Sequence, residues 1–137
     1  MKKIVIINGV NLGILGTREI TTYGGVDFLT YLEQLKAKFP QFEIIYYQTN
    51  YQDEIVNLLL FNKNIDGIVL NPGAFTHTSI IIADAIKSID TKVIEVHISN
   101  IFAREQYRKN SFIASACIGS ISGFGLRGYE LAINFFL

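Results

Sequence analysis

The feature that most constrains the fold is the alternation of short apolar runs with amphipathic segments. Residues 4–7 form an uninterrupted, β-branched apolar run that ends at Asn8 and Gly9, as expected of a strand buried on both faces. Residues 26–39 then repeat apolar side chains with the 3.6-residue period of a helix. The same succession recurs, which predicts strands over 42–48, 67–70, 92–97 and 116–122, helices near 53–64, 78–88 and 103–107, and a closing helix.

This alternation predicts an α/β fold. Strands separated by helices favour a five-stranded parallel sheet with right-handed crossovers and helices on both faces. A chain of 137 residues, half of them hydrophobic, can bury the core of one domain without disulfides. No linker, repeat or low-complexity segment interrupts the pattern, so we expect residues 1–137 to form a single domain.

Charge and cysteine content argue against several classes of partner. Twelve basic residues balance twelve acidic ones, which leaves no field to attract nucleic acid or an anionic membrane. The single cysteine, Cys117, cannot form an internal disulfide and lies among apolar residues, which indicates a buried side chain in a reducing compartment. The first apolar run is too short for a signal peptide or a membrane span. We therefore expect a cytoplasmic protein with no nucleic-acid or membrane partner.

Polar and glycine-rich clusters follow the predicted strands. In a parallel sheet the carboxyl ends of all strands lie along one edge, where open α/β sheets bind their ligands. The clusters would meet at that edge, although Asn and Gly are also ordinary turn residues. Neither a dinucleotide fingerprint nor a Walker A motif is present, so nucleotide binding is not supported. The clusters are residues 8–11, 48–50, 71–73, 97–100 and 123–125.

Both histidines of the chain belong to these clusters. Glu95 precedes His97 by two residues, so strand alternation puts the two side chains on one face. A carboxylate that holds one ring nitrogen leaves the other for proton transfer, although a histidine satisfied within the core is the alternative. With His77 and Asp84 this pair could form a metal site, but the Asn, Arg and Tyr around them are poor partners for a dication.

Residues 11–25 contain four glycines with Arg18 and Tyr23, a composition typical of a mobile lid. A nearby cation lowers the pKa of a phenol from its ordinary value near 10, so Arg18 could make Tyr23 a base; a merely packed loop tyrosine is the alternative. Arg104 and Arg108 are four residues apart, which places them on one face of the predicted short helix, suited to an anionic ligand. A solvated face with Glu105 as local partner remains open.

Several motifs together resemble the type II 3-dehydroquinate dehydratases, and the resemblance extends over almost the whole chain. It implies a flavodoxin-like fold, a dodecamer built from trimers, and conversion of 3-dehydroquinate to 3-dehydroshikimate in the shikimate pathway without metal or cofactor. The matching motifs are Asn8-Gly9-Val10-Asn11-Leu12, Leu15-Gly16-Thr17-Arg18-Glu19, Tyr23-Gly24, residues 71–79, residues 95–100, Ala103-Arg104-Glu105, Arg108, Gly123-Phe124-Gly125 and Gly128-Tyr129.

The resemblance also implies catalytic roles. Tyr23 would remove the proton beside the ketone, and Arg18 would lower the pKa of that phenol. Asn11 would hold a water against the enolate oxygen. His97, oriented by Glu95, would protonate the departing hydroxyl. An α-proton is acidic only if the enolate is stabilised, and hydroxide leaves only if it is protonated, so base and acid must be distinct groups.

The remaining residues are implied in substrate binding. The backbone amides of Ile98 and Ser99, with the Ser99 hydroxyl, would hold the carboxylate. Asn71 would position the leaving hydroxyl, and Asp84 would reach in from a neighbouring subunit. His77 and Arg108 would hold ring hydroxyls, and Arg104 would join the closed lid.

Four positions depart from the family pattern: proline is usual at Val10 and Ile20, asparagine at Gly13 and histidine at Phe102. Loss of two loop prolines should widen the unfolded ensemble of the lid, and Phe102 removes a polar group.

A flavodoxin-like binding or signalling module would have the same fold. A receiver domain would need acidic residues where this chain has Asn8 and Asn71, and a flavin carrier would need a Ser- and Thr-rich phosphate loop after the first strand.

Overall fold

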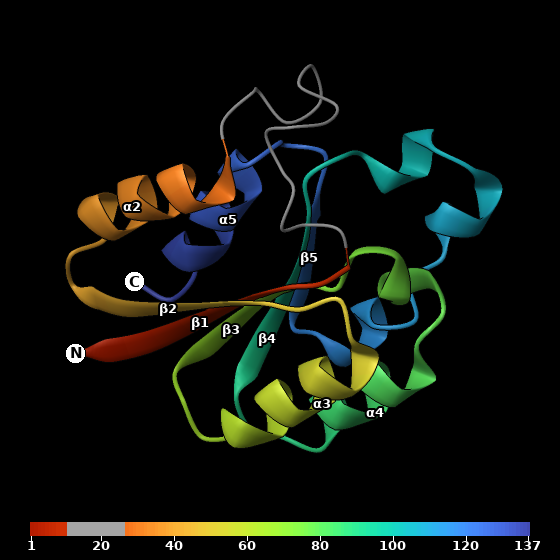
Figure 1. The fold of residues 1–137 in the computed structure, drawn as a ribbon, viewed down its shortest axis with the longest axis horizontal. Helices are drawn as coiled ribbons and strands as arrows, with labels where there is room; N and C mark the ends of the chain where they lie inside the picture. The colour runs from red at the N-terminus through yellow and green to blue at the C-terminus, as the bar shows by residue number, and fades with distance from the viewer. Residues whose placement is uncertain (11–26) are drawn as a thin grey trace.

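The computed structural model describes residues 1–10 and 27–137, which are built around a sheet of five parallel strands (Figure 1). Their order across the sheet is β2-β1-β3-β4-β5, the doubly wound order of flavodoxin-like proteins. The predicted α/β fold is therefore confirmed, with β3 at the centre and β1 and β4 beside it. The strands are β1 (Lys2–Asn8), β2 (Phe42–Gln48), β3 (Gly67–Asn71), β4 (Lys92–His97) and β5 (Gly119–Ser122).

In the described part of the chain, α-helices cover both faces of the sheet (Figure 1). α2 (Phe28–Lys38) and α5 (Arg127–Asn134) lie on one face, and α3 (Gln52–Phe61) and α4 (Ile80–Lys87) lie on the other. Within residues 1–10 and 27–137, no helix has the length and apolar character needed to cross a bilayer.

The apolar run of β1 serves two cores at once. Ile4 and Ile6 pack with α2 and α5, whereas Val5 and Ile7 pack with α3 and α4. All four side chains are fully buried, because successive residues of a strand point to opposite faces and both faces carry helices. This explains why the run shows no polar alternation.

Side-chain caps fix the starts of two helices. Asp27 accepts a hydrogen bond from the backbone nitrogen of Thr30 at 2.8 Å, and Ser79 accepts one from that of Ile82 at 3.0 Å. Such caps satisfy backbone donors that the first helical turn leaves unpaired. α2 and α4 consequently begin just after these caps, later than the periodicity of residues 26–39 and 78–88 indicates.

After α4, one predicted helix is wrong and the last strand begins later than expected. The helix expected over 103–107 is replaced by two 3₁₀ turns, η3 (Ile101–Ala103) and η4 (Gln106–Lys109), with an extended backbone at Arg104. Asn100 accepts a hydrogen bond from the backbone nitrogen of Phe102, a local bond that competes with a regular helix. The last strand begins at Gly119 because residues just before it form the turn η5 (Ala114–Ala116).

The loops that follow β1 and β3 are in close contact. The backbone nitrogen of Gly9 donates to the carbonyl of Asn71 at 2.7 Å, and a Cβ at Gly9 would lie 2.4 Å from the carbonyl oxygen of Pro72. Gly73 has a φ of 65°, and its backbone lies against Val10. Glycine is required at both positions, for space at the first and for a left-handed conformation at the second. The two loops therefore hold the ends of β1 and β3 together.

Candidate active site

The carboxyl ends of neighbouring strands bring the predicted polar residues to one edge. Asn8 and Asn71 are partners in the register of β1 and β3, and His97 ends β4 opposite Ser122 of β5. Asn8, Asn71 and His97 are all buried. The parallel register thus gathers residues that are far apart in the sequence, as the positions of the clusters predict.

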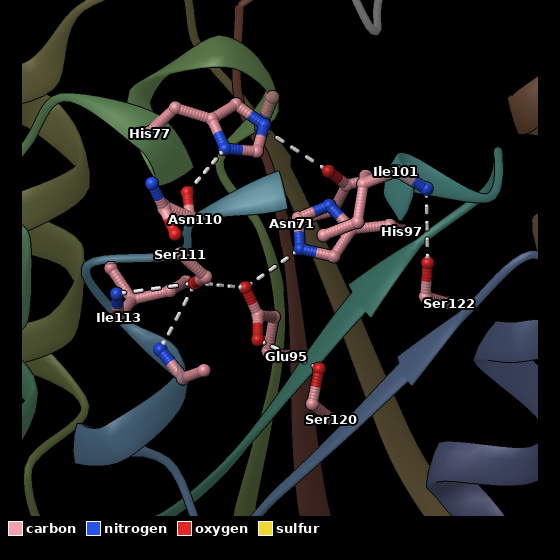
Figure 2. A network of polar contacts seen from close by, with 12 residues as sticks. Asn71, His77, Glu95, His97, Ile101, Asn110, Ser111, Ile113, Ser120 and Ser122 are labelled. Carbon is pink, nitrogen blue, oxygen red and sulfur yellow. Dashed lines mark hydrogen bonds and ion pairs between the residues drawn. The ribbon is translucent and has the colours of Figure 1, made fainter. Parts of the chain in front are cut away.

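The pairing of Glu95 with His97 is confirmed (Figure 2). Nε2 of His97 lies 2.7 Å from Oε2 of Glu95, and both side chains are buried. Glu95 also accepts hydrogen bonds from the hydroxyls of Ser111 at 2.6 Å and Ser120 at 2.8 Å. We call these four residues the Glu95 network. It satisfies a fully buried carboxylate with three donors, as burial of a charge requires.

These donors decide the charge of Glu95. Burial is the largest single influence and would raise the pKa of this carboxyl group. The hydrogen bond and charge of His97, with the hydroxyls of Ser111 and Ser120, together outweigh burial and hold the pKa of Glu95 below its ordinary value. The carboxylate is therefore ionised at neutral pH.

Cys117 illustrates the opposite balance. Its thiol is mostly shielded from solvent, and burial, with the negative charge of Glu95 in addition, raises its pKa to about 12. A thiol with that pKa stays protonated near neutrality and is a poor nucleophile. The interpretation of Cys117 as a small packed side chain is consistent with this environment.

His77 joins His97 from a different element. It ends the 3₁₀ turn η2 (Gly73–His77) after β3, and Nδ1 of its ring lies 2.7 Å from the carbonyl oxygen of Asn110. The centroids of the His77 and His97 rings are 6.3 Å apart, with their planes inclined by 23° (Figure 2). Both histidines of the chain therefore lie in one site, anchored at one ring nitrogen each.

The loop after β4 is hydrogen-bonded to the end of β5 and to the loop that follows it. The hydroxyl of Ser122 donates to the carbonyl of Ser99 at 3.3 Å, and the backbone nitrogen of Gly125 donates to the carbonyl of Ile98 at 3.0 Å. Arg104 Nη1 donates to the Ser99 hydroxyl at 3.3 Å. Ile98, Ser99 and Arg104 thus form one cationic, hydrogen-bonding corner beside His97.

The two arginines do not share a helix face, because the predicted helix is absent. They converge instead on Glu105: Nε of Arg108 lies 2.7 Å and Nε of Arg104 3.9 Å from the Oε2 atom of Glu105. The local partner envisaged from the sequence is therefore present, although the geometry differs from the expected one. Phe102, the apolar departure in this segment, is largely exposed on η3.

Several candidates lie apart from this site or outside the described residues. Asp84 is exposed on α4 and contributes to none of the hydrogen bonds of the Glu95 network. Asn11, Arg18 and Tyr23 fall outside the described residues, as do Gly13 and Ile20. No group of three or more His, Cys, Asp or Glu side chains suited to a metal ion occurs in residues 1–10 and 27–137.

Three polar residues of the site are not found by sequence reasoning. Ser120 is the register partner of Glu95, so aligning β4 with β5 could have found it. Tyr129, whose hydroxyl is hydrogen-bonded to Asn8 and Asn71, belongs to the Gly128-Tyr129 motif, but helical periodicity favours a plain core residue there. Ser111 lies in an irregular segment before η5, where no periodic pattern indicates the direction of a side chain.

The chain is similar to proteins of one known family over almost its whole length. Residues 2–137 match the family described as Dehydroquinase class II. A 3-dehydroquinate dehydratase of Caldicellulosiruptor saccharolyticus is 47% identical, over 97% of this chain and 94% of that protein. The type II dehydroquinase of Butyrivibrio crossotus superimposes with a TM-score of 0.91 at 41% identity, covering 98% of this chain and 97% of that one. The type II dehydroquinase of Propionibacterium acnes superimposes with a TM-score of 0.93 at 35% identity, covering 98% of this chain and 95% of that one. The chain therefore belongs to the class II dehydroquinase family.

Proposed function

We propose that this site removes water from 3-dehydroquinate to give 3-dehydroshikimate through an enolate intermediate, the step that this family contributes to the shikimate pathway. The chain is a hydro-lyase of the dehydroquinase class. The observation that carries the mechanism is the buried pair of His97 and Glu95 at the carboxyl edge of the sheet. Ligands of open α/β sheets bind at this edge.

The first step requires a base and a stabilised enolate. In the proposal Tyr23 takes the proton next to the ketone, and the Arg18 guanidinium favours the phenolate. Asn11 holds a water against the oxygen on which charge develops. A preorganised donor at such an oxygen typically contributes about 3 kcal/mol in comparable sites. Support for these three roles comes from the motifs shared with the family.

The second step requires an acid, and His97 is suited to it. Ionised Glu95 accepts a hydrogen bond from Nε2, which fixes the orientation of the ring. In the doubly protonated ring, Nδ1–H then transfers its proton to the departing hydroxyl, and Nε2 keeps its own. Asn71, buried at the end of β3, positions that hydroxyl in the proposal. Two different groups then act as base and acid, as an elimination from a ketone demands.

The rest of the site is proposed to bind the substrate. The backbone amides of Ile98 and Ser99 and the Ser99 hydroxyl hold the carboxylate, and the neighbouring guanidinium of Arg104 supports them with positive charge. Ring hydroxyls are held by His77 and Arg108. The Glu105 carboxylate now paired with Arg108 is exposed, so substrate can compete for that guanidinium at small cost.

The oligomer proposed for this chain is a dodecamer built from trimers, in which Asp84 completes a neighbour's site. Ile80 and Ile81 are 62% and 54% exposed on α4, the helix that carries Asp84. Isoleucines this exposed beside an acidic residue fit a buried contact between subunits better than a solvated surface. We further propose that the enzyme acts in the cytoplasm without metal or cofactor.

The test is to mix the purified protein with 3-dehydroquinate and to follow the absorbance of the enone product with and without a chelator. We expect the product to form at the same rate in the two assays. Absence of product would refute the proposed function, whereas product that disappears with chelator would refute the metal-free mechanism alone.

A further inference from the structure

The hydroxyl of Tyr129 connects the neighbouring strands β1 and β3 at their carboxyl ends. Tyr129 projects from α5, is fully buried, and donates a hydrogen bond to Oδ1 of Asn8 at 2.7 Å. The same hydroxyl oxygen accepts a hydrogen bond from Nδ2 of Asn71 at 3.0 Å. Nδ2 of Asn8 in turn lies 3.4 Å from the hydroxyl of Tyr46. We call these four residues the Tyr129 network.

Each hydrogen bond of this network has a determined direction. The backbone nitrogen of Gly73 donates to Oδ1 of Asn71 at 3.2 Å, so the carboxamide must turn its NH₂ group towards Tyr129. Tyr129 then accepts from Asn71, and its own proton goes to Asn8. A rotated Asn71 would set its NH₂ group against the N–H of Gly73, leaving two donors facing each other.

We propose that Tyr129 is a positioning residue of the dehydration: its hydroxyl fixes the plane and direction of the Asn71 carboxamide. The inference rests on the proposed function, in which Asn71 positions the leaving hydroxyl. With one N–H of Asn71 committed to Tyr129 and Oδ1 engaged by Gly73, the other N–H keeps a fixed direction. A small misplacement of such a group can cost a large factor in rate.

Tyr129 does not itself exchange a proton. Its burial raises the pKa of the phenol far above the ordinary value, with the hydrogen bonds from Asn71 and to Asn8 opposing that shift only in part. The hydroxyl therefore remains protonated and keeps donating to Asn8 across the pH range in which an enzyme works. It can hold a neighbour but cannot serve as base or acid.

The phenyl ring and the hydroxyl of Tyr129 have separable roles. The ring packs edge-on against Phe28, with centroids 4.9 Å apart, in the core between α2, α5 and the sheet. Tyr129→Phe keeps this packing and removes only the hydroxyl. Tyr31→Phe is a matched control, because Tyr31 packs against the same core and its hydroxyl takes no part in the Tyr129 network.

The experiment compares two rates in the same enzyme sample: exchange of the substrate α-proton with solvent, and formation of the enone. Both need folded protein, so their ratio is independent of the fraction that is folded. For Tyr129→Phe we expect the ratio of exchange to enone formation to rise about tenfold or more, because the leaving step loses a positioned group, a loss of about 1.4 kcal/mol per factor of ten. Tyr31→Phe should leave the ratio unchanged.

The outcomes separate this inference from the proposed function. An unchanged ratio in Tyr129→Phe, or a parallel fall of both rates, would refute the positioning role. If wild-type protein forms no enone at all, the proposed function itself fails. Should Tyr129→Phe prove insoluble, Asn8→Ala tests the same idea: without its acceptor the Tyr129 hydroxyl turns towards Asn71, and the ratio must again rise.

Discussion

Removal of the Ser111 hydroxyl should show how strongly the Glu95 network depends on its donors. The Ser111 oxygen accepts hydrogen bonds from the backbone nitrogens of Ile113 at 3.3 Å and Ala114 at 3.1 Å. Its own proton is therefore directed at Oε2 of Glu95, 2.6 Å away. Ser111→Ala removes this donor and leaves a buried carboxylate with two donors in place of three.

The expected loss can be estimated from the charge of the acceptor. A hydrogen bond to an ionised group typically stabilises a protein by about 1.5–3 kcal/mol, and Glu95 is fully buried, so water cannot replace the donor. We expect Ser111→Ala to lower the free energy of unfolding by about 2 kcal/mol at pH 7. Ser115→Ala, at an exposed position in η5, should change it by less than about 0.5 kcal/mol.

The effect of pH on the free energy of unfolding follows from the direction in which the pKa of Glu95 is shifted. The pKa of Glu95 is lower in the folded protein than its ordinary value, so its stabilisation is present above the ordinary value near 4.3 and is lost as pH falls through the folded pKa. Ser111→Ala raises the folded pKa. The difference between mutant and wild type should therefore be largest near neutrality and shrink in acid.

Urea unfolding at equal protein concentration, from pH 7 down to the lowest pH at which both proteins remain folded, measures this difference. Equal destabilisation at every pH would mean that Ser111 only packs the loop before η5. A loss below about 0.5 kcal/mol at pH 7 would refute the argument that Glu95 depends on this donor.

Three further predictions concern the proposed roles. Tyr23→Phe should bind 3-dehydroquinate but lose at least about 10²-fold in kcat, and calorimetry with steady-state kinetics checks both; retention of a tenth of the wild-type kcat would contradict the base assignment. His97→Ala should lower kcat far more than it raises KM, and a raised KM at nearly normal kcat would make His97 an anchor for substrate instead. Asp84→Ala should reduce turnover although Asp84 is exposed in the single chain, and a fully active wild-type monomer in light scattering would overturn the shared site.

The regular parts of this structure could be predicted because backbone periodicity determines side-chain direction. The run at residues 4–7 indicates a strand buried on both faces, and the two-residue spacing from Glu95 to His97 is enough to predict their contact. Such reasoning fails where the backbone is irregular. The turn η3 is capped by a side-chain hydrogen bond of Asn100, and Ser111 reaches Glu95 from a segment without periodicity.

Contacts between distant segments can be predicted only if the register between neighbouring strands is known, and the sequence does not give this register. Ser120 lies opposite Glu95 only because β5 pairs with β4 in one particular alignment. Tyr129 reaches Asn8 and Asn71 because it lies in the core cluster that also contains residues of β1 and β3. A tyrosine in a helix interior gives no local indication of whether its hydroxyl is satisfied by two carboxamides.

The placement of the two networks across the sheet has a consequence for how pH acts on the enzyme. The Glu95 network is charged and lies mainly on β4 and the outermost strand β5, where Ser120 is exposed. The Tyr129 network is neutral and lies at the ends of β1 and β3, and burial raises the pKa of both its phenols, Tyr46 and Tyr129. Among the described residues, acid therefore titrates the group that orients the proton donor His97, while the carboxamides that hold the leaving hydroxyl in the proposed reaction keep their geometry.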